Sequence, residues 1–99
     1  MITNTYPTAS RADRMRSVLT EAFHPVRLAI EDDSARHAGH AGASGDGETH
    51  FSVTIVSESF NGRSRVERSR MVHEVLANEF ATRLHALSLS LRSPHEDKS

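Results

Sequence analysis

Cysteine is absent from this chain of 99 residues, and so is tryptophan. Without a thiol, the chain can form no disulfide, no thiolate metal ligand and no cysteine nucleophile of its own. Histidine is abundant instead, with seven residues. Any metal chemistry must therefore use imidazole, carboxylate or ligands that a partner supplies.

Long apolar runs are also missing, so the sequence predicts no membrane span. The start of the chain has no apolar segment typical of a secretory leader, and we therefore expect a cytoplasmic protein. The net charge is only −1 with histidine neutral. A strong general affinity for nucleic acid or for an anionic membrane needs an excess of lysine and arginine, and is not expected.

Catalytic motifs are not found either. The sequence has no P-loop, no Gly-x-Gly-x-x-Gly and no Ser/His/Asp order, which favours a binding module over an enzyme. A chain of this length suggests one domain. We expect it to span residues 10–92, between polar tails at residues 1–9 and 93–99.

The most informative stretch is residues 49–76. From His50 to Ser57 apolar and polar residues alternate, which indicates a strand with Phe51, Val53 and Ile55 on the buried face. Asn61-Gly62 then signals a turn. Ser64, with Glu67 three residues later, predicts a capped helix.

The other elements follow from the same patterns. Ser10 resembles a helix cap, and the helix should end before Pro25 with an apolar face of Met15, Val18, Leu19, Ala22 and Phe23. Residues 26–31 and 84–91 alternate as strands, with Val26, Leu28 and Ile30 on one face of the first. Residues 32–48, rich in glycine and alanine, should form an exposed, mobile loop. Pro94 should stop the last strand, with no further helix.

The predicted order is therefore α-β-β-α-β. The strand–helix–strand unit makes its two strands parallel, and the first two strands are most simply antiparallel. We expect an α/β (α+β) domain with a three-stranded mixed sheet and helices on one face.

The same stretch carries a family resemblance. The pattern F-x-G-x-x-x-V-x-R-x-R-x-V-x-x-x-L resembles the signature of the BolA family; its residues here are Phe60, Gly62, Val66, Arg68, Arg70, Val72 and Leu76. Residues 47–51, 84–89 and the segment from Ser34 to His40 also resemble family patterns. The family usually has histidine between the two arginines, where this chain has Ser69. The resemblance implies the BolA fold, which is similar to class II KH domains.

Topology should gather histidines at one end of the sheet. The first strand ends, and the second and third begin, at the same end, which brings His37, His40, His50 and His85 together. Each also has a plainer interpretation. His85 could be a half-buried core imidazole, His50 could point to solvent, and His37 and His40 could be solvated loop residues. Two imidazoles are too few for a closed zinc site but suit a site shared with a partner.

The resemblance implies such a shared site. BolA proteins pair with monothiol glutaredoxins and hold a [2Fe-2S] cluster between them, with thiolates from the glutaredoxin and glutathione and histidine from the BolA protein. His85 matches the family's main ligand, and either His37 or His40 the second. Such a chain would bind no cofactor when isolated, as a monomer or weak dimer. A histidine-ligated cluster would suit iron–sulfur trafficking or iron and redox sensing.

Arginines form the remaining cluster: Arg63, Arg65, Arg68 and Arg70, at the start of the predicted second helix. They could be a solvated face, with the Arg68 stem over the core edge, or could bind a partner or DNA. The family includes transcriptional regulators of morphology and stress response, so DNA binding is the alternative function. A base-stacking platform is poorly supported, since Phe23, Phe51 and Phe80 are assigned to the core.

Overall fold

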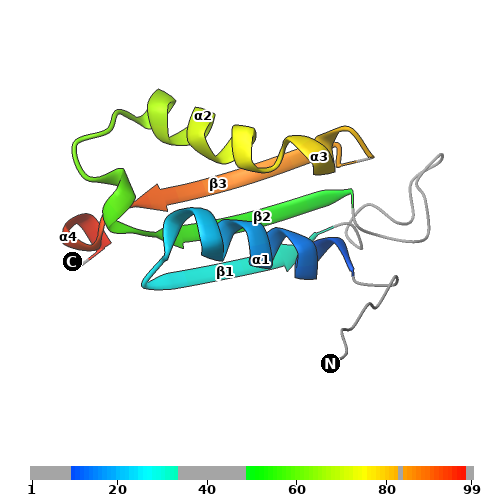
Figure 1. Ribbon diagram of the computed structural model, residues 1–99, viewed down its shortest axis with the longest axis horizontal. Coiled ribbons are helices and arrows are strands. Elements are labelled where there is room, and N and C mark those ends of the chain that lie inside the picture. Colours follow the sequence, from blue (N-terminus) through cyan, green and yellow to red (C-terminus); the bar gives the residue numbers. More distant parts are fainter. Residues whose placement is uncertain (1–9, 34–48, 83, 98–99) are drawn as a thin grey trace.

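The structure is a computed structural model that describes residues 10–33, 49–82 and 84–97. Five main elements follow one another as predicted (Figure 1). They are α1 (Arg11–Phe23), β1 (Arg27–Asp32), β2 (His50–Val56), α2 (Arg65–Val75) and β3 (Ala86–Arg92). Three short helical turns complete the described chain: η2 (Glu58–Phe60), α3 (Ala77–Phe80) and α4 (Pro94–Asp97).

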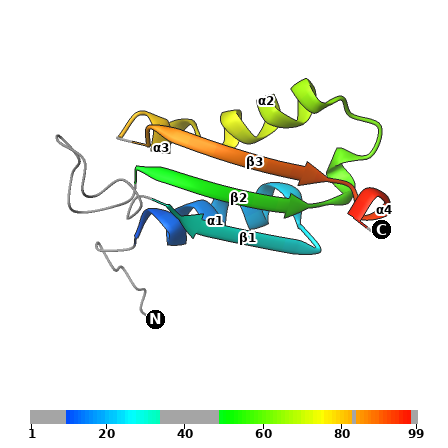
Figure 2. The same ribbon diagram turned by 180° about the vertical axis from the view of Figure 1, so that it is seen from behind.

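The sheet has the order β1-β2-β3, so β2 is central and β3 is an edge strand. β1 pairs antiparallel with β2, with Leu28 opposite Ile55, and β3 pairs parallel with β2, with His50 opposite Ala86. The predicted mixed sheet is thus confirmed. α1 and α2 cover one face, while the view from behind shows the other face open (Figures 1 and 2).

The two main helices begin at the capping residues that the sequence predicts. The Ser10 hydroxyl accepts the Asp13 amide at 3.1 Å at the start of α1. Ser64 and Glu67 form a complete capping box at the start of α2. Before α2 the chain turns at Gly62, whose φ of 73° lies in the left-handed region. The Arg63 amide closes this turn on the Phe60 carbonyl at 3.1 Å.

The core lies between the sheet and the two helices. Its buried members include Phe51, Val53 and Ile55, as the alternation in β2 predicts. The others come from the helices and connections: Met15, Leu19, Phe23, Phe60, Val72, Leu76 and Leu84. Phe60 is completely buried, although the sequence pattern does not assign it to the core. Phe80, which the pattern assigns to the core, is half-buried and packs against it.

Two predicted apolar positions are exposed instead. Val18 on α1 is 38% exposed, and Val26 is 67% exposed because β1 begins after it, at Arg27. β1 also runs on through Asp32, and the Asp33 amide still bonds the His50 carbonyl at 2.7 Å. The strand therefore continues into what was predicted as loop. The rest of that loop, residues 34–48, and the tail at residues 1–9 lie outside the described residues.

The prediction that no helix follows the last strand is wrong. Residues 94–97 form α4, and Ser93 and Glu96 cap it: the Ser93 amide donates to the Glu96 carboxylate at 2.9 Å and the Glu96 amide to the Ser93 hydroxyl at 3.3 Å. Pro94 stands at the first helical position, where its missing N–H costs nothing. Asp97 binds Arg27 of β1 and Arg92 of β3, which holds α4 against the sheet.

A buried ion-pair network joins the start of α1 to α3. Arg11 donates to Glu79 at 2.6 Å, and Arg14 donates to both oxygens of the same carboxylate at 2.9 Å. The hydrogen bond from Arg14 is the main cause that lowers the pKa of Glu79, against the opposing effect of its burial. No helix in the described ranges combines the length and the apolar character needed to cross a membrane.

Candidate functional site

One end of the sheet gathers the end of β1 and the starts of β2 and β3. The Thr49 carbonyl accepts the amide of His85 at 2.8 Å and that of Ala86 at 3.1 Å. These two bonds hold the chain just before β3 against the chain just before β2. His85, just before β3, and His50, the first residue of β2, are thereby held close together, although 35 positions separate them in the sequence.

The two imidazole rings stand edge to face. Their centroids are 6.0 Å apart and their planes meet at 84°. The topological prediction that β2 and β3 bring these two histidines together agrees with this geometry. His85 is exposed, so the alternative of a half-buried core imidazole is wrong: β3 begins only at Ala86. His50 is half-buried, and its Nδ1 lies 2.8 Å from the Thr49 hydroxyl.

The second predicted ligand cannot be placed. His37 and His40 both belong to residues 34–48, outside the described residues. Across residues 10–33, 49–82 and 84–97, no three histidine, aspartate or glutamate side chains gather as a metal site would require. This part of the chain therefore offers an imidazole pair, which can complete a site only with ligands from elsewhere.

The four arginines of the predicted cluster differ in their exposure to solvent. Arg63, Arg65 and Arg70 are exposed, but Arg68 is only 8% exposed. Its guanidinium donates to the carbonyls of Arg63 and Leu91, at 2.9 and 3.1 Å. The same group lies 5.9 Å from the centre of the Phe60 ring.

Arg68 also binds Glu96 with two hydrogen bonds, at 2.7 and 3.0 Å. This hydrogen bonding is the main reason why the pKa of Glu96 falls to about 2, and bonds from Ser93 add to it. Of the four predicted arginines, Arg68 is thus occupied by an internal carboxylate. The other three remain at the surface around the start of α2.

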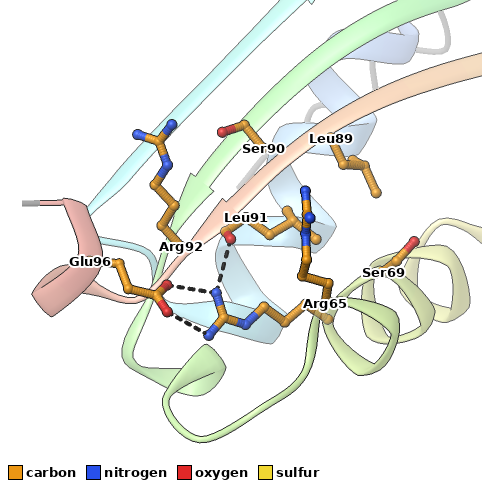
Figure 3. A pocket seen from close by; sticks show the side chains of 8 residues that line it. Arg65, Ser69, Leu89, Ser90, Leu91, Arg92 and Glu96 are labelled. Atoms are coloured by element: carbon orange, nitrogen blue, oxygen red, sulfur yellow. Dashed lines mark hydrogen bonds and ion pairs between the residues drawn. The ribbon is translucent and has the colours of Figure 1, made fainter.

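A groove of about 560 Å³ runs between α2 and the outer edge of β3. Figure 3 shows Arg65 and Ser69 of α2 on one side, residues of β3 on the other, and Glu96 at one end. Its lining residues are Arg65, Arg68, Ser69, Leu89, Ser90, Leu91, Arg92 and Glu96. These belong to the far half of β3, so the groove and the histidine pair lie at opposite ends of that strand.

Comparison with known proteins agrees with this architecture. The profile of a family described as "BolA-like protein" matches residues 19–96. The chain belongs to the BolA-like family. Protein BOLA1, chloroplastic, from Arabidopsis thaliana is 50% identical over 92 residues, which are 91% of this chain. The chain spans only 58% of the length of that relative.

Two further similarities bear on fold and function. The DNA-binding transcriptional regulator BolA of Escherichia coli (strain K12) is 42% identical over 77 residues, covering 78% of this chain and 70% of that protein. The solved structure of BolA1 from Arabidopsis thaliana superposes with a TM-score of 0.79 at 46% identity, covering 98% of this chain and 99% of that one. The BolA fold predicted from the signature residues is therefore confirmed.

Proposed function

We propose that this BolA-like chain is a non-enzymatic binding module that pairs with a monothiol glutaredoxin and shares a [2Fe-2S] cluster as cargo. His85 is the proposed ligand on this chain, with His37 or His40 from the loop as the second. The observation that carries the proposal is the exposed His85, fixed beside His50 at the end of the sheet.

The residues at this end fit a shared iron–sulfur site. In the described part of the chain, the His85 side chain makes no hydrogen bond that would occupy a ring nitrogen. Its backbone is anchored to Thr49, so the imidazole is presented from a fixed position. Because the chain contains no cysteine, every thiolate must come from the partner and glutathione.

The chemistry suits transfer or sensing. An imidazole ligand raises the reduction potential of an iron–sulfur centre, and histidine takes up a proton in the physiological pH range, which favours its release from the metal. An exposed imidazole on a firm strand end can therefore stabilise a cluster held mainly by the partner, and later release it. Trafficking of the cluster, or sensing of iron and redox state, is the proposed cellular role.

Co-purification with a monothiol glutaredoxin tests the partner assignment. The full chain and a reduced monothiol glutaredoxin are mixed with iron, sulfide and glutathione, then separated by size. We expect a coloured complex of the two proteins that contains iron and absorbs visible light. If the glutaredoxin elutes with its iron alone and this chain elutes apart and colourless, the proposed function is wrong.

DNA binding is the second candidate, favoured by the exposed Arg63, Arg65 and Arg70 at the start of α2. The occupied Arg68 and the net charge of −1 weaken it. The test is to measure the affinity for random duplex DNA at rising salt concentrations. The steepness with which the affinity falls gives the number of phosphate contacts. We expect weak binding at physiological salt. A tight, sequence-selective complex that persists without a glutaredoxin would place this candidate first.

A further inference from the structure

β3 is one of the two edge strands of the sheet, and backbone groups along its outer edge point away from β2. The Ala86 amide donates to the Thr49 carbonyl, and the Arg92 carbonyl accepts from the Ser57 amide. The even-numbered residues of β3 therefore direct their backbone N–H and C=O groups toward β2. In a parallel ladder the intervening residues face outward. Leu87 and Leu89 thus direct an N–H and a C=O each away from β2, and neither finds a partner in the described ranges.

The groove beside this edge already holds a carboxylate. Arg68 is held by two carbonyls and a phenyl ring, and binds Glu96 through two hydrogen bonds. Arg65, one turn earlier on α2, lines the same groove and makes no ion pair with any described residue. The groove therefore combines a site that demonstrably accepts a carboxylate with a second, open cation.

We propose that this groove binds an extended acidic segment of a partner protein, which adds to β3 as a fourth strand. Its backbone would pair with Leu87 and Leu89, while acidic side chains of one face would reach Arg65 and compete with Glu96 for Arg68. The surface is separate from the histidine pair, so the inference does not depend on the proposed glutaredoxin function.

Two other occupants fit less well. A second copy of this chain would bring its own Arg65 and Arg68 against the same groove, and like charges repel. Single-stranded nucleic acid binds through stacked bases, but no aromatic residue is among those that line the groove. The outward N–H and C=O groups of β3 match a peptide backbone, which repeats donors and acceptors at strand spacing.

The probe is a fluorescent synthetic peptide of about eight residues that alternates glutamate and threonine, titrated into the full chain. Fluorescence anisotropy gives the affinity, and NMR shifts give the location. We expect saturable binding with the largest amide shifts at Leu87 and Leu89. Absence of binding, or shifts centred on His50 and His85, would overturn the proposal.

Two matched variants separate the groove from general electrostatics. Arg65→Glu reverses the open cation; it stands at the first position of α2, where an acid suits the helix dipole, so the fold should persist. Arg70→Glu makes the same charge change on the same helix away from the groove lining. We expect Arg65→Glu to weaken peptide binding about tenfold and Arg70→Glu about twofold or less. Equal losses would overturn the proposal.

Two changes of the ligand complete the test. N-methylation of alternate peptide amides keeps the charge but removes backbone donors, and should abolish binding. Unchanged binding of the methylated peptide would show attraction of charge without strand addition and would contradict the inference. A thymidine oligonucleotide should compete less well than unlabelled peptide. The reverse order would assign the groove to nucleic acid instead.

Discussion

Arg68 of α2 and Glu96 of α4 are joined by two hydrogen bonds across 28 positions of sequence. Arg68 is nearly buried, while the Glu96 side chain is 46% exposed. The pair holds the short helix α4 at the end of the groove. It also occupies the guanidinium of Arg68, one of the arginines of the family signature. α4 is thus held to α2 through Glu96, and to β1 and β3 through Asp97.

Acid should release α4 from the body of the domain. Because Arg68 holds the folded-state pKa of Glu96 at about 2, below the usual value for glutamate, the pair contributes stability above the ordinary pKa. That contribution is lost as the pH falls from about 4.3 through about 2. NMR titration should show the amides of α4 losing structure in this range. Glu96→Gln should remove this step; if α4 in the variant titrates as in the wild type, Glu96 does not hold it.

Gly62→Ala should destabilise the domain by about 1 kcal/mol. The cause is purely conformational, because φ at Gly62 is 73° and a Cβ there would meet no atom within 4 Å. Chemical denaturation measures the change, with Asn61→Ala as the control because φ at Asn61 is −59°. A Gly62 variant as stable as the wild type would show that the turn adopts another conformation.

Phe60→Ala should destabilise the domain by about 3–5 kcal/mol, since it removes a fully buried ring. That ring packs 5.2 Å from Phe23 and lies under the Arg68 guanidinium. Phe80→Ala is the matched control: Phe80 is half-buried and stacks on His73 at the surface, so a smaller loss is expected. Equal losses in urea denaturation would contradict the burial that distinguishes the two rings.

The main helices and strands can be predicted from the sequence because each follows a local pattern. Alternation placed Phe51, Val53 and Ile55 inward, and the capping box at Ser64 located the start of α2. The burial of Phe60 is not predicted, because Phe60 lies in the short turn η2, where neither the strand period of two nor the helical period applies. Phe60 is buried because its ring packs against Phe23 and lies under the Arg68 guanidinium. Only the tertiary structure brings these three residues together.

The sequence also contains a local signal for α4. Ser93 and Glu96 have the spacing of a capping box, with Pro94 at the first helical position. Pro94 alone does not reveal α4, because proline can both end a strand and stand at the first position of a helix. At the candidate site, topology correctly joined His50 and His85, but the exposure of His85 depends on where β3 begins, and periodicity leaves strand boundaries uncertain by a residue or two.

The visible spectrum of the glutaredoxin heterocomplex formed by His85→Ala tests the central proposal most directly. His95→Ala is the control, because His95 is an exposed histidine on α4, at the opposite end of β3. We predict that circular dichroism of both isolated variants matches the wild type, that His95→Ala leaves the cluster spectrum unchanged, and that His85→Ala shifts it and speeds cluster loss. A His85→Ala heterocomplex with the wild-type spectrum and the wild-type rate of cluster loss would contradict the account.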